Sequence, residues 1–504
     1  MAFGGTLVPK LNLILSLICK EYEEERMAND PGFHMFPVIT GSDNPQCQIP
    51  EVQALVSKFT LYGSLITGII SAFVSPKLGA LSDRYGRKLL ICFSTFGMLI
   101  SEVITIVVAR CPESISVYWM LLGYAFDGLG GSFIAAMALS FAYASDCTAP
   151  DKRNVAFGYY HGCLFAGIAL GPLIAGKIVA VTGNILSIFY LAVGAHALFF
   201  LWLVFVVPES LTKERQRIAR EKLSVKDADY VPGHGEGATR TTFTWVAKYL
   251  RGSNLVAPLA ILWPTEPGTN PQLRRNLFFL AAVDATMFGV AMGSMTVVLL
   301  YAEYMFDWGT YDTSIFLSSV NIGRVTVLLV LLPLGSRLLR GPSSKAVKKS
   351  SGCDNIELGI IRVAVLFDMI GYIGYCTVRS GPLFILSGII ASVGGMGSPT
   401  LSSAITKHVP PERTGQILGA MGLLHAMGRV IAPIIFNLIY AKTVGGFTQT
   451  VFVCLASSFG LAFIFSLFIK PHSKLACSSG GSKMASISNK MYSLLGRTPS
   501  SHWQ

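Results

Sequence analysis

The 504-residue sequence is 52% hydrophobic and 13% charged, whereas soluble domains carry about 25% charged residues. Its formal net charge of +12 would suggest nucleic-acid binding in a soluble protein, but the Lys and Arg residues stand in short loops beside apolar runs. This composition excludes a soluble enzyme or a nucleic-acid-binding protein and predicts a multispanning membrane protein.

Runs of about twenty apolar residues are long enough to cross the hydrocarbon core as helices. Twelve such runs follow one another along the chain. Their limits are 2–19, 54–75, 89–109, 117–143, 155–180, 186–207, 277–300, 314–335, 359–378, 383–405, 415–440 and 449–469. The sequence therefore predicts an all-α membrane protein with twelve transmembrane helices.

The first run is the weakest of these predictions. It starts at Met1 and has Pro9 and Lys10 in its middle, so it can cross only if Lys10 faces protein or water. No basic stretch precedes it and no small-residue cleavage site follows it, so we do not expect a cleaved signal peptide. Two interpretations stay open, a short first helix or a sequence that lacks the first turns of that helix.

Two halves repeat one another on either side of a polar linker. The segment "APDKRNVAFGYYHGCLFAGIALGP", ending at Pro172, aligns without gaps on "PPERTGQILGAMGLLHAMGRVIAP", ending at Pro433. Repeated six-helix halves are typical of transporters whose substrate site lies near the midplane. The predicted division is a six-helix bundle at 1–208, a cytoplasmic linker at 209–275, a second six-helix bundle at 276–470 and a disordered cytoplasmic tail at 471–504.

The charges of the loops predict the orientation. Short loops rich in Lys and Arg stay cytoplasmic, and the basic loops here are the even-numbered ones. The first loop is instead acidic, from Glu21 to Glu25, and the seventh carries Glu303, Asp307 and Asp312. Both termini are therefore predicted to be cytoplasmic. The basic residues are Lys77, Arg84, Arg87, Lys88, Lys152, Arg153, Lys213, Arg215, Arg217, Arg220, Arg337, Arg340, Lys345, Lys348, Lys349 and Arg413.

The second loop reads "GALSDRYGRK" from Gly79 to Lys88. Its pattern G-x-x-x-D-R-x-G-R-K resembles the loop signature of the major facilitator superfamily, and the resemblance extends over all twelve runs. It implies two six-helix bundles that rock about a central site, with Asp83 docked on the turn from Pro411 to Gly415 to hold the inner gate shut. We expect Asp146 to be the companion of Arg84. The implied gating residues are Gly79, Asp83, Arg84, Gly86, Arg87, Lys88, Asp146, Glu412 and Arg413.

The fifth run is similar to the antiporter motif of the drug:proton branch of that superfamily. Gly158, Gly167, Gly171, Pro172 and Gly176 fit the motif, and alanine replaces its penultimate glycine at 175. Small residues also pack helices closely without any transport role, and uptake carriers have glycine-rich fifth helices too. A second departure is Tyr124, which stands four residues before Gly128 where that branch usually has arginine.

Ionisable residues within apolar runs need a partner or a purpose, because each costs about 3 kcal/mol to insert. We expect Asp127 either to titrate a proton or to pair permanently with a buried cation. Asp284 could pair with Lys10 or Arg429. An anionic substrate or an aspartate could satisfy Arg429 or Arg324. The candidates for the substrate or proton cavity are Lys10, Asp127, Asp284, Arg324 and Arg429, and Asp368 is a further charge within a run.

Histidines and cysteines carry weaker signals. We expect His161 and His425 to be packed, hydrogen-bonded residues, and Tyr124, Tyr159 and Tyr160 either to pack or to line a cavity. Cys47 and Cys111 could form a disulfide if both face the exterior. Most of the others are expected to be apolar fillers. Five of them, Cys19, Cys92, Cys163, Cys376 and Cys454, lie inside apolar runs.

The sequence has no phosphate loop, nucleophile elbow or metal-ligand spacing, so no enzyme activity, metal or cofactor is expected. The predicted function is proton-coupled export of a small organic solute by a monomer in the plasma membrane or a vacuolar or other internal membrane. A proton-coupled uptake carrier, resembling the proton-coupled folate transporter group, is the alternative within the class. A membrane receptor that does not transport is the alternative from another class.

Overall fold

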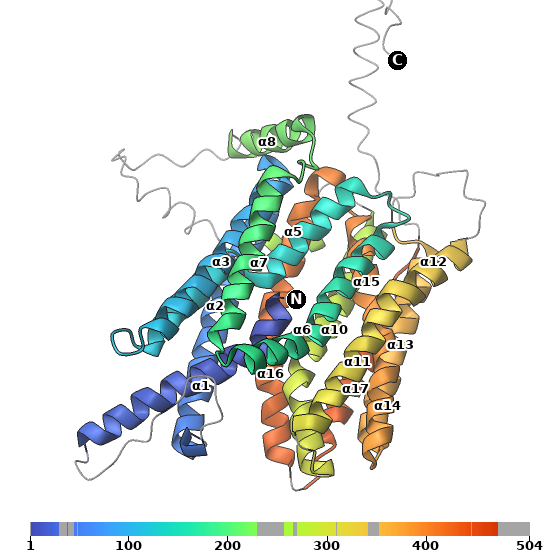
Figure 1. Ribbon diagram of the computed structural model, residues 1–504. Helices are drawn as coiled ribbons and strands as arrows, with labels where there is room; N and C mark the ends of the chain where they lie inside the picture. The colour runs from blue at the N-terminus through green and yellow to red at the C-terminus, as the bar shows by residue number, and fades with distance from the viewer. Residues whose placement is uncertain are drawn as a thin grey trace, which may run out of the picture.

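The computed structural model describes residues 2–29, 38, 45–47, 49–228, 257–265, 270–308, 310–340, 352–444 and 446–471. Within these ranges every regular element is helical (Figure 1). The predicted disordered tail falls almost wholly outside the described residues, and so does most of the predicted linker after Ala228. Lys345, Lys348 and Lys349, whose charges support the predicted orientation, are also outside them.

Most predicted spans are single long helices. α2 (Pro50–Tyr85) and α3 (Arg87–Arg110) form the charged hairpin, and its end of the bundle, at the top of Figure 1, is called the motif end here. Besides α1, which is described below, the other unbroken long helices in the described residues are α6 (Arg153–Thr182), α7 (Leu186–Phe205), α10 (Pro271–Phe306), α13 (Asn355–Thr377), α16 (Thr414–Thr443) and α17 (Thr450–Leu467).

Ten helices in the described part of the chain are long and apolar enough to cross a membrane. The first and ninth predicted spans are not among them, although α1 (Ala2–Asn29) and α13 are helical and pack with the rest. The chain is therefore an integral, multi-pass membrane protein. A count of twelve spans stays a prediction.

α1 corrects the prediction for the first span and the first loop. The helix continues ten residues beyond the predicted limit of 19 and ends at Asn29, so Glu21 to Glu25 lie on a helix rather than in a loop. The reason is local, because Leu11 to Asn29 contains no Gly or Pro, and Leu, Glu, Arg and Met favour helix.

Three predicted spans are interrupted at their middle. The run 117–143 is a short η2 (Val117–Trp119), α4 (Met120–Leu129) and α5 (Ser132–Cys147), which are separated at Gly130 and Gly131. The run 383–405 is α14 (Gly381–Ser392), a 3₁₀ turn η5 (Val393–Met396) and α15 (Gly397–Thr406). Gly131 has φ +80°, a conformation that favours glycine.

The run 314–335 consists of α11 (Thr310–Thr326), a π-helical turn η4 (Val327–Leu331) and α12 (Leu332–Arg340). Pro333 has no N–H to donate to the preceding turn, which accounts for the altered hydrogen-bond pattern there.

The predicted repeat coincides with two matching helices. α6 and α16 each have 30 residues, and their internal prolines, Pro172 and Pro433, stand at the same position. α16 packs lengthwise against α2 and also against α5, while α6 packs against α11 and α15. These contacts join the two groups of helices. The domain limits themselves stay a prediction.

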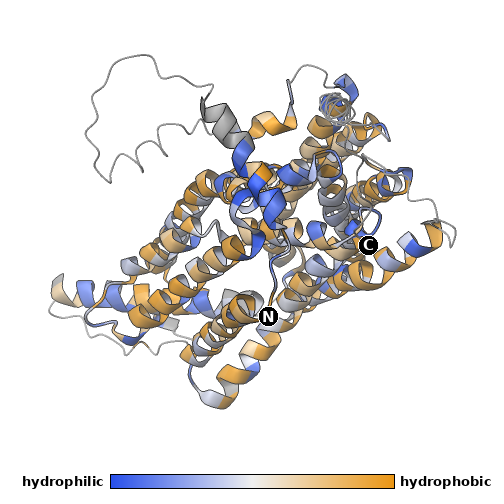
Figure 2. Cartoon of the chain, turned by 90° about the horizontal axis from the view of Figure 1, so that it is seen from above, coloured by the Kyte–Doolittle hydropathy of each residue, from blue (hydrophilic) through white to orange (hydrophobic). Residues whose placement is uncertain are grey.

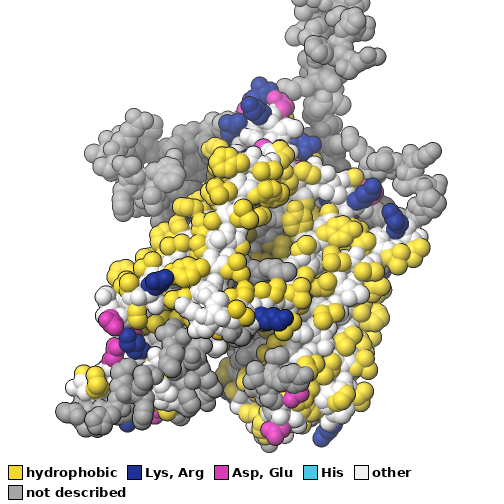
Figure 3. Space-filling model, viewed as in Figure 1, with side chains coloured by type: hydrophobic (Ala, Val, Ile, Leu, Met, Phe, Trp, Pro, Cys, Tyr) yellow, Lys and Arg dark blue, Asp and Glu magenta, His cyan; other side chains and the backbone are white. Residues whose placement is uncertain are grey.

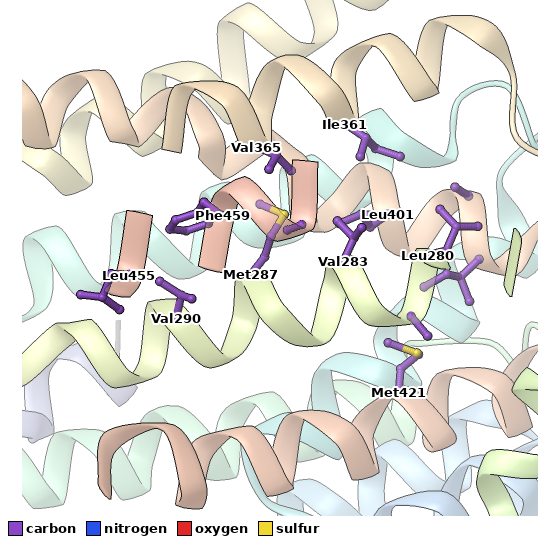
Figure 4. Packing of buried hydrophobic residues seen from close by; sticks show 14 of the residues in the cluster. Leu280, Val283, Met287, Val290, Ile361, Val365, Leu401, Met421, Leu455 and Phe459 are labelled. Carbon is purple, nitrogen blue, oxygen red and sulfur yellow. The ribbon is translucent and has the colours of Figure 1, made fainter. Parts of the chain in front are cut away.

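Apolar side chains form the core between the long helices. In the largest cluster, Leu280, Val283 and Met287 of α10 pack against α13, α15, α16 and α17 (Figure 4). Seen from above, the long helices are predominantly apolar along their length (Figure 2). The basic α8 (Lys213–Ala228) lies across the motif end, against α2 and the 3₁₀ turn η6 (Pro411–Arg413).

A disulfide joins Cys19, on α1, to Cys47, in the 3₁₀ turn η1 (Pro45–Cys47). Its end of the bundle, opposite the motif end, is called the disulfide end. The pairing of Cys47 with Cys111 that the sequence left open does not form, since Cys111 is a free, exposed thiol. Cys19 is not an apolar filler, because α1 packs against η1 and α2 at this point and brings its thiol to Cys47.

Candidate functional site

A single residue separates the helices of the charged hairpin. α2 ends at Tyr85 and α3 begins at Arg87, with Gly86 between them at φ +105°. This backbone conformation is readily adopted only by a residue without a Cβ. The turn brings Asp83 and Arg87 together, with Oδ1 and Nη1 2.6 Å apart and both side chains buried.

Asp83 also joins the hairpin to the second half. Gly79 allows the helices to meet closely, because a Cβ there would collide with the carbonyl oxygen of Gly415. The Asp83 carboxylate accepts hydrogen bonds from the backbone N–H groups of Gly415 at 2.9 Å and Gln416 at 2.8 Å. These groups at a helix start lack intrahelical partners and carry partial positive charge. The predicted contact of Asp83 with this turn is therefore present, while its role in gating stays a prediction.

Arg87, rather than Arg84, is the partner of Asp146. Its Nε donates to Oδ2 of Asp146 at 3.0 Å, and its guanidinium is fully buried between Asp146 and Asp83. The prediction that Arg84 pairs with Asp146 is thus wrong. Arg84 is half-buried in the last turn of α2, whereas the Gly86 turn directs Arg87 inward. Glu412 and Arg413 are half-buried in η6, beside this cluster.

Sequence reasoning missed Glu209, which caps the start of α3. Its carboxylate accepts hydrogen bonds from the N–H groups of Arg87 at 2.8 Å and Lys88 at 3.1 Å. The Lys88 ammonium in turn donates to the carbonyl of Val204 at 2.8 Å. A signal for an external cap existed, because Gly86 provides no side chain at the N-cap position of α3.

A second buried ion pair at the motif end was also missed. Nζ of Lys407, after α15, lies 2.8 Å from Oε1 of Glu357 at the start of α13 and 3.6 Å from Asp354. Ser403 donates a hydrogen bond to the same Glu357 oxygen at 3.0 Å. Glu357 and Lys407 are both almost fully buried.

Within the bundle, Asp127 lies at the break between α4 and α5. Ser132 donates from its hydroxyl to Oδ2 of Asp127 at 2.9 Å, and Nη1 of Arg429 donates to that hydroxyl at 3.4 Å. Asp127 and Ser132 belong to the first half and Arg429 to the second. The interruption at Gly130 and Gly131 therefore places a carboxylate where it is linked, through one hydroxyl, to a cation of the opposite half.

Asp284 pairs with a residue other than the two predicted. Its Oδ2 lies 2.7 Å from Nε2 of His425, whose ring stacks on Phe288. The predicted partners were Lys10 and Arg429. His425 takes this place because α10 and α16 pack side by side within the second half, whereas Lys10 is on α1 of the first half, with its ammonium 4.5 Å from the centre of the Tyr124 ring.

Arg324 and Asp368 lie in the second half near the interruption of the tenth span. The Arg324 guanidinium lies 5.1 Å from the centre of the Phe165 ring, which belongs to the first half. Asp368 is buried against Gly394, where a Cβ would collide with its carboxylate. His161 is packed as expected, stacked on Phe141 and within 3.4 Å of the Ser398 hydroxyl.

A further ionisable pair lies inside the first half. Nδ1 of His196, on α7, is 2.9 Å from Oε2 of Glu102, on α3. Glu102 falls inside the predicted span 89–109, so its charge within an apolar run was the signal that sequence reasoning overlooked.

The glycines of α6, which is the fifth predicted span, lie in different environments. Gly158 faces Leu332 of α12, Gly167 and Gly171 meet the backbone of α1 at Gly4 and Gly5, and Gly176 faces open space. The glycines thus allow close helix packing in two places. Among the described residues, no group of His, Cys, Asp and Glu is arranged to hold a metal ion.

Comparison with known proteins adds the evidence of relatives. The family described as the Major Facilitator Superfamily matches residues 51–347. The chain is 33% identical to the MFS-type transporter avaJ of Aspergillus versicolor, over 94% of this chain and 86% of that protein. It is 24% identical to the MFS efflux pump atnC of Emericella nidulans, over 87% of this chain and 78% of that protein.

It is also 21% identical to the proton-coupled folate transporter of Rattus norvegicus, over 80% of this chain and 76% of that protein. Among solved structures, the human organic anion transporter MFSD10 is similar with a TM-score of 0.62 at 16% identity, covering 92% of this chain and 99% of that one. At this identity the likeness concerns the fold alone.

Proposed function

This chain belongs to the major facilitator superfamily of membrane transporters, and from that premise we propose that it exports a small organic solute in exchange for protons by alternating access. The observation that carries the proposal is the joining of the two halves at the motif end by Asp83 and the start of α16. Alternating access requires contacts of this kind, which form in one state and break in the other.

A second contact between the halves supports this mechanism. The Asn154 side chain, in the first turn of α6, donates to the Ser336 hydroxyl of α12 at 3.2 Å, and both are buried. α6 corresponds to α16 in the repeat, so each half has a helix start held by the other half. In this proposal the two contacts close the motif end, and opening requires both to break.

We assign the motif end to the cytoplasm on two independent grounds. Its loops carry the basic residues, as expected for the cytoplasmic side. The opposite end carries the disulfide between Cys19 and Cys47, and disulfides persist in oxidising compartments rather than in the cytosol. With an even number of spans, both termini are cytoplasmic.

Asp127 is the proposed proton site. As a carboxylate it accepts the Ser132 hydrogen bond and attracts Arg429 of the opposite half. Protonation would remove that negative charge and weaken the link between the halves at the break in the fourth span. Proton binding is thereby coupled to the relative position of the two halves, which a coupled transporter requires.

Export is favoured by the glycine pattern of the fifth helix and by the likeness to a protein named as an efflux pump. A proton-coupled uptake carrier is the second candidate, favoured by the likeness to the proton-coupled folate transporter. The fold and the proposed gate are the same in both.

The first experiment compares the small molecules in cells and medium, by mass spectrometry, between cells that lack the protein and cells that overproduce it. A compound that moves into the medium with expression supports export and supplies the substrate. A compound that accumulates in the cells supports uptake or internal storage, and overturns export across the plasma membrane.

The Asp127→Asn variant then tests the proton site with that substrate. We expect transport driven by a pH gradient to be lost while exchange of labelled for unlabelled substrate persists, because exchange needs no net proton movement. Asp312→Asn, a change at an exposed position at the start of α11, is the matched control. Loss of both activities, or of neither, would contradict the assignment.

A further inference from the structure

An apolar pocket of about 230 Å³ lies between α1, α6 and α7. Its volume exceeds the roughly 150 Å³ that hold a benzene molecule in an engineered apolar cavity. One threonine is the polar member of its lining. The residues around it are Gly5, Thr6, Gly171, Ile174, Ala175, Ile178, Ile188, Leu191, Ala192 and Ala195.

Small residues create this pocket. Gly171 lies against the backbone of Gly4 and Gly5 and so forms its floor, where α1 crosses α6. On the α7 side, Ala192 and Ala195 line the pocket with small side chains. The alanine at 175, a departure from the antiporter motif, lines this pocket and is nearly fully buried.

The pocket is elongated along the helices and lies toward the disulfide end. The lining residues span eight positions on α6, from Gly171 to Ile178, and eight on α7, from Ile188 to Ala195. At 1.5 Å per residue each wall is about 10 Å long. The nearby ends of both helices, at Thr182 and Leu186, mark the disulfide side. The pocket therefore occupies one leaflet.

The mouth of the pocket faces the bilayer. Ile174 is 42% exposed and Leu191 55% exposed, and the surface over α6 and α7 in Figure 3 is predominantly hydrophobic. Lys177 is exposed one turn beyond Ile174 on the same side of α6. It stands five residues before the end of the helix, about 8 Å from it, within reach of the lipid headgroups for a long side chain.

We propose that this pocket binds one acyl chain of a glycerophospholipid from the leaflet on the disulfide side, with the lipid phosphate paired to Lys177. The narrow, elongated shape and the apolar walls suit a hydrocarbon chain, and the cation at the outer edge suits the phosphate to which that chain is attached. The bound acyl chain would then support α1 at the point where α1 crosses α6. α1 also carries Lys10.

The test uses the full-length protein in lipid nanodiscs that contain phosphatidylcholine with a photoactivatable diazirine on one acyl chain. After illumination, digestion and mass spectrometry locate the labelled residues. We expect labelling concentrated on Ile174, Ile178 and Leu191, above the level at other lipid-facing positions. Uniform labelling over the lipid-facing helices would overturn the proposal without the need for any variant.

Two test variants and one control variant extend the labelling experiment. Ala195→Leu fills the pocket from an exposed position, and should lower labelling there on the order of tenfold, since the added carbons occupy the space of the chain. Ala441→Leu, at an exposed position of α16, is the matched control and should leave it unchanged. Lys177→Gln should lower it by a smaller factor. Unchanged labelling in Ala195→Leu would also overturn the proposal.

Discussion

The two halves place a buried ion pair at the same point of the repeat but with opposite polarity. In the first half the acid, Asp146, ends α5 and the base, Arg87, begins α3. In the second half the base, Lys407, follows α15 and the acid, Glu357, begins α13. Lys407 stands 261 positions after Asp146, the same offset that relates Pro433 to Pro172.

The difference shows what the repeat preserves and what it leaves free. A helix start and a helix end meet at this point in each half, and Coulomb attraction between them is the same whichever side carries the positive charge. In the described part of the chain, the first-half pair has a third member, Asp83, that hydrogen-bonds to the other half. We therefore interpret the first-half cluster as part of the gate and the second-half pair as a tie within its own half.

The largest expected effect comes from removing the shared cation of the first-half cluster. Arg87→Gln removes the buried cation that lies between Asp83 and Asp146, and breaking a buried ion pair by removing one partner typically costs about 3–5 kcal/mol. We expect a large drop in the midpoint of thermal unfolding in detergent. Arg84→Gln, three residues away and half-buried, is the control and should change the unfolding midpoint little. An equal drop in the two variants would contradict the pairing of Asp146 with Arg87.

Exchanging the charges of the second-half pair tests whether polarity matters there. Glu357→Lys alone places two cations together and should destabilise the protein by several kcal/mol. Adding Lys407→Glu should restore more than half of that loss and leave transport close to normal. The corresponding exchange of Arg87 and Asp146 should not restore the lost stability, because Asp83 and Glu209 also face that point. Similar recovery of stability in both halves would contradict the proposed difference between the two ion pairs.

His408 should make the stability of the second half depend on pH in a way that the first half does not share. Burial, with a smaller effect from the Lys407 ammonium, lowers the pKa of His408 from 6.5 to about 4, whereas the residue at the corresponding repeat position, Cys147, is exposed. The folded state therefore prefers neutral His408, and this stability, on the order of 3 kcal/mol in full, is present above pH 6.5 and lost as pH falls toward 4.

Thermal unfolding measured between pH 7 and pH 5 should show this loss, and His408→Asn should make the decline shallower. Cys147→Ser is the control and should follow the wild-type profile. A His408→Asn profile parallel to that of the wild type would rule out the contribution of this residue.

The smallest expected effect is at the rim of the first-half cluster. Nη1 of Arg215, on α8, lies 4.0 Å from Asp146, and its side chain is 43% exposed. Exposed pairs contribute roughly 0.2–1 kcal/mol, so Arg215→Gln should shift the unfolding midpoint by a few tenths of the Arg87→Gln effect at most. A shift as large as that of Arg87→Gln would mean that α8 is an integral part of the gate.

The sequence allowed most helices to be located, because a membrane span requires a long apolar run and the chain marks each run with charged or Gly- and Pro-containing loops. It also allowed the Asp83 contact to be expected through the hairpin motif. The prediction failed at several helix ends, because the length of an apolar run does not by itself show where a helix stops or breaks. α1 continued to Asn29, and the runs 117–143 and 383–405 contain Gly-Gly pairs that end a helix inside the membrane region.

By itself, then, the amino-acid order determined which segments are apolar helices, where the basic loops lie, and that two segments ending at Pro172 and Pro433 are copies. Only the tertiary structure decided the partners of charged groups and cysteines. Asp146 pairs with Arg87, Asp284 pairs with His425, and Cys19 forms a disulfide with Cys47. The reason is physical, since helix formation depends on neighbours in the chain, whereas pairing depends on which faces of distant helices pack together.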